Sequence, residues 1–194
     1  MPISSHLSKA LASVALLFAL TACSVNVKKN EEGGDKNVDI KTPFGGIHVN
    51  ENADVRDTGL PVYPGAKPKP KDDSQDEKSA NVDISTSAFG LKVVAVEYES
   101  DDAPGKLIAF YQDHMKQFGK VLECHSSGHN YNYRGDRHNN GSEELKCDGD
   151  SNGSTIELKA GTENNQHIVS IKPSGKGSDL GLVYVRVRGK EGTI

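Results

Sequence analysis

Residues 91–119 read LKVVAVEYESDDAPGKLIAFYQDHMKQFG, and this stretch decides the fold. Its first part, Leu91 to Tyr98, is rich in Val and partly alternates apolar with polar residues, which predicts a β-strand. Asp101 and Asp102 then precede Pro104, and an Asp can cap a helix whose first turn accepts Pro. We therefore expect a strand followed by a helix at about 103–118.

The expected helix has one apolar stripe. Its members recur at helical spacing and are Leu107, Ile108, Tyr111, Met115 and Phe118. Gly119 supplies a C-terminal stop. Such a stripe could line a ligand groove, but it is more often the face that packs on a sheet, and we expect the packed face here.

Short β-rich runs follow the helix. They predict further strands at 121–124, 144–147, 155–160, 167–172 and 182–188. Strands grouped around a single helix predict an α+β fold, in which one main helix (about 103–118) covers an antiparallel sheet. Composition divides the chain into a signal peptide (1–22), a flexible tether (23–36), a strand-rich segment (37–66), a polar linker or loop (67–79) and a compact α+β domain (80–194).

Two segments resemble each other. Residues 37–49 read NVDIKTPFGGIHV and residues 81–93 read NVDISTSAFGLKV, so both contain NVDI, a later Thr and a Phe-Gly pair. Each predicts a strand, a tight turn and a second strand. Either hairpin chemistry arose twice, or a β unit was duplicated and stacks on or pairs with its copy.

The N-terminus has the layout of a secretory signal peptide. Lys9 precedes the apolar run Ala10 to Leu20, which is shorter than the roughly 18–20 residues that span a membrane. The following residues, Leu20-Thr21-Ala22-Cys23, resemble the lipobox of bacterial lipoproteins. This resemblance implies a diacylglycerol on the Cys23 thiol, cleavage before Cys23 and usually an acyl chain, such as palmitate, on its amine. Two or more chains hold a protein stably on a membrane.

The chain has three cysteines. Lipidation of Cys23 would leave Cys124 and Cys147, an even pair in an oxidising compartment. We expect a disulfide between them, and two buried free thiols are the alternative. The bond would close a loop of about 24 residues and contribute roughly 3 kcal/mol to stability.

A second resemblance covers roughly Leu60 to Arg188. The turn Tyr63-Pro64-Gly65-Ala66, the helix with Phe110-Tyr111 and the ending Phe118-Gly119 are similar to an uncharacterised class of bacterial envelope lipoproteins. The resemblance implies a helix followed by a short β-meander, and no activity comes with it.

A long polar loop, 126–142, holds the candidate sites. Tyr and Asn serve adaptable binding loops, so Tyr131, Tyr133, Arg134 and Arg137 are the candidate residues for binding a partner or an envelope glycan. The weak metal candidates His125, His129 and His138 lie beside Cys124, whose thiolate a disulfide would remove. We expect neither a metal nor another cofactor.

Charge and motifs narrow the functional classes. A net charge of −4 argues against nucleic-acid binding, and no Gly-x-Ser-x-Gly elbow occurs. We expect a lipid-anchored protein of the bacterial envelope, facing the periplasm or the cell surface, and on the outer membrane if the organism has two membranes. It would act as a structural or binding module for a protein or glycan rather than as an enzyme. The alternatives are an envelope hydrolase, or a metal-handling protein using the Cys124–His138 region.

Overall fold

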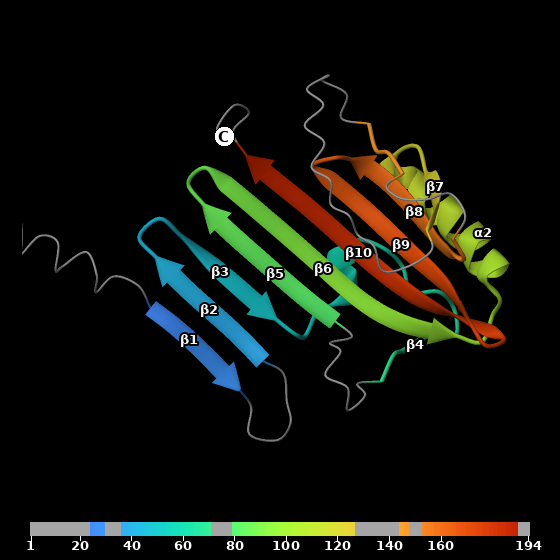
Figure 1. Ribbon diagram of the computed structural model, residues 1–194, viewed down its shortest axis with the longest axis horizontal. Helices are drawn as coiled ribbons and strands as arrows, with labels where there is room; N and C mark the ends of the chain where they lie inside the picture. The colour runs from blue at the N-terminus through green and yellow to red at the C-terminus, as the bar shows by residue number, and fades with distance from the viewer. Residues whose placement is uncertain (1–23, 30–35, 71–78, 127–143, 148–152, 190–194) are drawn as a thin grey trace, which may run out of the picture.

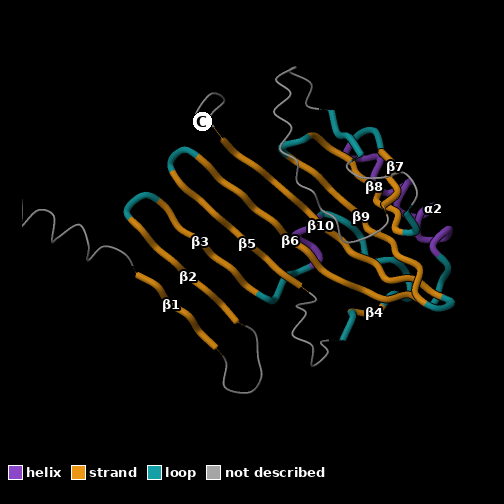
Figure 2. The backbone as a smooth tube through the Cα atoms, viewed as in Figure 1, coloured by secondary structure: helices purple, strands orange, loops and turns teal. Residues whose placement is uncertain are grey.

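The computed structural model describes residues 24–29, 36–70, 79–126, 144–147 and 153–189. These residues form a mainly antiparallel sheet with one α-helix on one face, so the predicted α+β class is confirmed (Figures 1 and 2). The strands are β1 (Ser24–Lys29), β2 (Lys36–Thr42), β3 (Gly45–Asn50), β4 (Lys67–Pro68), β5 (Ser79–Thr86), β6 (Phe89–Ser100), β7 (Leu122–Ser126), β8 (Thr155–Thr162), β9 (Asn165–Ser174) and β10 (Gly177–Gly189). The helices are α2 (Pro104–His114) and the 3₁₀ turns η1 (Val55–Thr58) and η2 (Met115–Phe118).

The strand order is β1-β2-β3-β5-β6-β10-β9-β8-β7, and β4 pairs with the end of β6. Two meanders meet at the centre, because β6 and β10 pair from Ser100↔Ser178 to Phe89↔Gly189. The strand-rich segment 37–66 and the region 80–194 therefore both contribute strands to one sheet.

The helix covers the C-terminal half of the sheet. Leu107, Tyr111 and Met115 are fully buried, and they belong to one core with side chains of β6, β8, β9 and β10. Ile108 and Phe118 pack against this core. The predicted stripe is thus a packing face, as its spacing indicates, and the last turn tightens into η2.

The prediction that an Asp caps the helix is wrong. The N-cap of α2 is Ala103, and no side chain caps the helix. The Asp102 carboxylate instead accepts hydrogen bonds from Lys106 Nζ at 2.6 Å and from the Tyr63 hydroxyl at 2.9 Å. These two bonds hold the pKa of Asp102 below its usual value, and the bond from Lys106 has the larger effect.

The residues of the Tyr-Pro-Gly-Ala turn pack against the Phe-Tyr pair of the helix. The Ala66 N–H donates to Tyr63 O at 3.0 Å, and Gly65 has φ 83°, as a type II turn requires. The Tyr63 ring meets Phe110 edge to face at 5.2 Å. The Tyr111 hydroxyl donates to Pro61 O at 3.0 Å. The turn therefore fixes the approach of the helix to the sheet.

The two similar segments form equivalent hairpins, and the hairpins pair with each other. Residues 37–49 lie on β2 and β3, residues 81–93 lie on β5 and β6, and β3 is antiparallel to β5. Each turn uses the same device. Thr42 Oγ1 donates to Gly45 O at 2.9 Å and accepts from the Phe44 N–H. Thr86 Oγ1 donates to Phe89 O at 2.9 Å and accepts from the Phe89 N–H.

Three local expectations need correction. Ser24–Lys29, which we assigned to the tether, pair with β2 as an edge strand because Val25 and Val27 extend its apolar pattern. The start of the expected linker is ordered, since β4 and the Lys69 N–H both bond to β6. Residues 144–147 form no strand, because β7 rather than this segment pairs with β8.

We predict that Leu107→Ala destabilises the protein by about 2–5 kcal/mol, because it leaves a cavity in a fully packed core. Denaturant unfolding measures the effect. Gly105→Ala, two residues before Leu107 and on the exposed side of α2, is the control. It is expected to be neutral or to stabilise by roughly 0.5 kcal/mol, since its new Cβ meets no atom within 4 Å. Equal losses in both variants would contradict this packing.

Candidate functional site

The most unusual surface of the described residues is an aliphatic face on the N-terminal half of the sheet. Residues directly opposite in neighbouring strands share a face, as do alternate residues of one strand. The register therefore builds two rows of side chains across six strands. One row is Val25, Ile40, Ile47, Ile84, Leu91 and Val187, and the other is Val27, Val38, Val49, Val82, Val93 and Val185. We call these twelve residues the aliphatic face.

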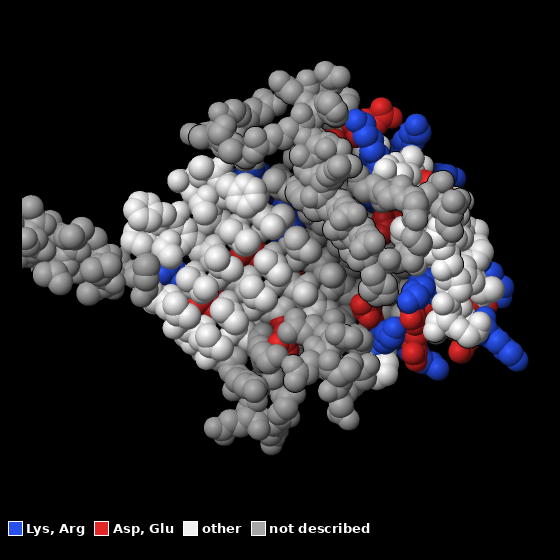
Figure 3. Space-filling model, viewed as in Figure 1, with Lys and Arg blue, Asp and Glu red and all other residues white. Residues whose placement is uncertain are grey.

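The aliphatic face lies on the side of the sheet away from the helix. On β6, Val94 and Val96 point toward the helix-bearing side and are buried, so Leu91 and Val93 point the other way. No helix of the described chain packs on this side. Val25, Val27 and Ile47 are 64%, 61% and 37% exposed. In the space-filling view this part of the sheet shows few charged residues, which gather instead toward α2 (Figure 3).

The reverse side of the same strands is polar. One cross-strand row contains Asp39, His48, Asp83, Lys92 and Arg186. In this row His48 Nδ1 lies 2.6 Å from Asp39 Oδ1. A neighbouring row contains Asn37, Asn50 and Asn81. The N-terminal strands are therefore amphipathic, yet the helix lies over the other half of the sheet. Contiguous apolar surface is a common feature of interaction sites.

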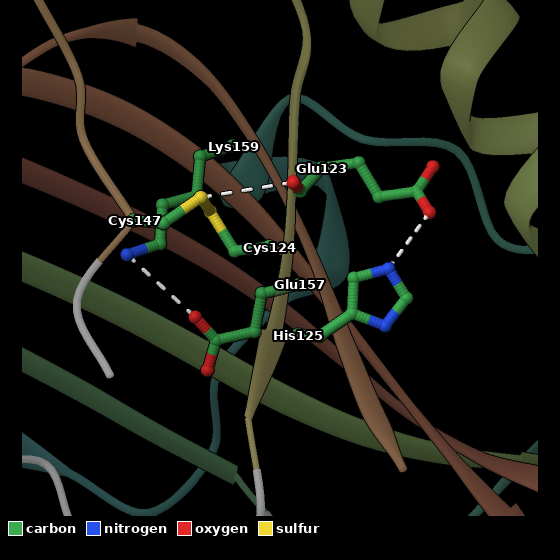
Figure 4. The surroundings of a disulfide bond; sticks show 6 residues. All are labelled: Glu123, Cys124, His125, Cys147, Glu157 and Lys159. Atoms are coloured by element: carbon green, nitrogen blue, oxygen red, sulfur yellow. Dashed lines mark hydrogen bonds and ion pairs between the residues drawn. A yellow bond between two sulfur atoms is a disulfide. The ribbon is translucent and has the colours of Figure 1, made fainter. Parts of the chain in front are cut away.

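A disulfide closes the other edge of the sheet (Figure 4). Cys124 of β7 bonds to Cys147 with Cα atoms 5.4 Å apart, as the cysteine count predicts. Cys147 Sγ also lies 3.6 Å from Glu123 O. Beside the bond, Glu157 and Lys159 are almost fully buried, with Oε2 and Nζ 3.6 Å apart. The disulfide thus fixes the segment 144–147 against β7 and β8.

The predicted metal ligands are not brought together in the described chain. Cys124 forms the disulfide and so has no thiolate to bind a metal. The side chain of His125 lies on the opposite side of β7. His125 Nε2 instead pairs with Glu123 Oε1 at 3.2 Å (Figure 4). The described residues contain no group of three His, Cys, Asp or Glu able to hold a metal. His129 and His138 lie outside the described residues.

The predicted binding residues Tyr131, Tyr133, Arg134 and Arg137 also lie outside the described residues. Sequence reasoning missed the aliphatic face. Its signal was present in the alternation Val-Asp-Ile and Ile-His-Val of the similar segments. That alternation predicts which residues share a face, but it does not show that the face stays uncovered.

A polar hollow of about 460 Å³ lies beside the β9–β10 turn, at the end of the sheet opposite the β2–β3 and β5–β6 turns. Charged side chains line it, among them Lys67, Glu99 and Asp179. Lys69 Nζ lies 2.9 Å from Asp179 Oδ2, so part of this charge is paired. The lining contains no His or Cys, and so it lacks the base that most often activates a nucleophile.

Comparison with known proteins gives no relative. No family model, no curated protein and no solved structure matches the chain. Among the described residues, no helix has both the length and the apolar composition needed to cross a membrane.

One titratable group is built into the core next to the helix. The His167 ring stacks on Phe118 at 3.6 Å, and its Nδ1 donates to Thr58 O at 2.8 Å. Gly59, in the left-handed conformation at φ 71°, leaves room for the ring, since a Cβ there would lie 3.2 Å from His167 Cε1. Burial lowers the pKa of His167 below its ordinary value of 6.5.

We predict that His167 makes the protein less stable in mild acid. Below about pH 6.5 the unfolded chain takes up a proton that the buried ring resists, so the free energy of unfolding falls as pH falls from 6.5 toward the lowered pKa. Above pH 6.5 this contribution is constant. Denaturant unfolding at several pH values measures the slope. His167→Gln is expected to flatten it, and an unchanged slope would contradict the assignment.

Proposed function

We propose that this chain is a lipid-anchored protein of the bacterial envelope that acts as a binding module, with the aliphatic face as its binding surface. The single observation that carries the binding role is the contiguous row pattern of that face. Twelve aliphatic side chains lie in register on one side of the sheet, and no described element packs on them.

The anchor follows from sequence and fits the fold. Cys23 ends the lipobox-like stretch, and Ser24 begins β1, the outermost strand of the aliphatic face. An acyl chain on Cys23 would therefore be attached one residue from the sheet. β1 extends the aliphatic face up to the anchored residue. A long flexible tether would instead hold this face away from the membrane.

The disulfide supports an oxidising compartment. A Cys124–Cys147 bond can form and persist in the periplasm or on the cell surface, whereas thiols in the cytosol are kept reduced. The face itself favours one kind of partner. Val and Ile side chains offer shape and apolar area but no hydrogen bonds, so they suit a protein with an apolar surface better than a glycan.

The anchor is tested by Cys23→Ala. This variant is expected to lose labelled palmitate and to move from the membrane fraction to the soluble fraction, because two acyl chains supply the stable attachment. Ser24→Ala is the matched control at the next position and should keep both properties. If Cys23→Ala stays in the membrane fraction to the same extent as the natural protein, the lipoprotein assignment is wrong.

The binding face is tested with two adjacent positions of β3. A photo-crosslinking residue at Ile47 projects from the aliphatic face, whereas one at His48 projects from the polar side. In the lipidated protein on living cells, we expect a discrete protein adduct from position 47 and none from position 48. Unlabelled Ile47→Lys should compete poorly for that adduct, while His48→Lys competes fully. Equal adducts at both positions would contradict the binding role of the face.

A further inference from the structure

The β2–β3 turn, the β5–β6 turn and the start of β1 lie together at one end of the sheet (Figure 1). Ser24 pairs with Lys41, Gly45 pairs with Thr86, and Phe89 pairs with Gly189. These pairings place both turns of the duplicated unit and the last residues of β10 on one edge. We call this edge the tip end, and its members are Ser24, residues 41–46, residues 85–90, Arg188 and Gly189.

Each turn at the tip end presents a phenylalanine to solvent. Phe44 is 82% exposed and Phe89 is 42% exposed. The Thr hydroxyl bonds described above hold both turns, so neither ring is needed to form its turn. Two exposed aromatic rings at the points of adjacent hairpins cost hydration free energy unless an apolar medium receives them.

Charge also distinguishes the tip end. Lys41 and Arg188 are exposed there. The opposite end of the central strands carries charges of both signs. Its carboxylates are those of Glu97, Glu99, Asp101, Asp102 and Asp179, and its ammonium groups are those of Lys67, Lys69, Lys106, Lys172 and Lys176. A negatively charged lipid surface would attract the two cationic side chains of the tip end.

We propose that the tip end is a membrane-docking edge, in which Phe44 and Phe89 enter the interface of the same bilayer that holds the lipid anchor. This inference rests on the proposed lipidation of Cys23. Ser24 is a member of the tip end, and one residue spans at most about 3.6 Å. The acyl chains of Cys23 therefore enter the bilayer beside Lys41 and the Phe44 turn. The lipid surface that holds these chains is the partner that the tip end can contact.

The orientation has a consequence for the aliphatic face. With the tip end at the bilayer, β1, β2, β3 and β5 run away from the membrane surface instead of lying on it. The aliphatic face then opens sideways to the aqueous compartment, where a partner can reach it.

Tryptophan insertion tests the docking edge, because the natural chain contains no Trp. Phe44→Trp and Phe89→Trp each give a single reporter in the lipidated, full-length protein. The probe is a vesicle of phosphatidylethanolamine and phosphatidylglycerol, with and without brominated acyl chains. Compared with the Cys23→Ala form in buffer, we expect a blue-shifted emission at both positions and strong quenching by the brominated lipid.

Two control reporters fix the geometry. Lys176→Trp lies in the β9–β10 turn at the opposite end of the sheet and should show neither the shift nor the quenching. Val27→Trp lies on the exposed aliphatic face about 10 Å from Ser24 and should be quenched much less than Phe44→Trp. Equal quenching at Val27 and Phe44 would mean that the face lies flat on the bilayer, and this would overturn the docking edge.

The same samples separate the two proposals. If mass spectrometry finds no lipid on Cys23, the proposed anchor fails. If the lipid is present but Trp at positions 44 and 89 keeps its solvent-exposed emission, the anchor stands and the docking edge is wrong.

Discussion

The pairing of β6 with β10 is the interaction on which the rest of the structure depends. These two long strands stay in register from Ser100↔Ser178 to Phe89↔Gly189. The N-terminal strands attach to one side of the pair and the C-terminal strands to the other. One pair of strands therefore carries two chemically different surfaces. Val96 and Leu182 lie in the core under the helix, whereas Val93 and Val185 lie on the aliphatic face.

The length of the helix explains why one half of the sheet is covered and the other is open. α2 has 11 residues, which corresponds to about 16 Å, and the strands are spaced about 4.8 Å apart. Such a helix can lie across only a few of the strands. Its buried stripe packs on β8, β9, the C-terminal part of β6 and the N-terminal part of β10. The strands β1, β2, β3 and β5 extend beyond its reach, and their polar side faces the solvent on the helix-bearing side.

Much of the fold is encoded locally and could be predicted. The spacing of Leu107, Tyr111 and Met115 locates the helix, and the two NVDI segments locate the hairpins. What the sequence does not encode locally is pairing between distant segments. Nothing near Val49 specifies Val82 as its neighbour, and the strand β1 forms because β2 offers an open edge to an alternating Ser-Val-Asn-Val stretch. The same reasoning explains Asp102, whose carboxylate meets Tyr63 from 39 residues away instead of capping its own helix.

The candidate site was predictable only in part. The disulfide followed from counting cysteines, because Cys124 and Cys147 remain after Cys23 is assigned. The aliphatic face required the register of six strands and the position of the helix, and neither is visible in a single segment. The predicted Tyr and Arg residues of the polar loop stay a prediction.

The central claim is that the two hairpins join into one sheet and thereby build the aliphatic face. Methyl–methyl nuclear Overhauser contacts in selectively labelled protein test it most directly. Contacts within each hairpin, Val38–Val49 and Val82–Val93, serve as internal references. We predict contacts of similar strength between the hairpins, Val49–Val82 and Ile47–Ile84. Strong reference contacts without any contact between the hairpins would contradict the continuous sheet and with it the aliphatic face.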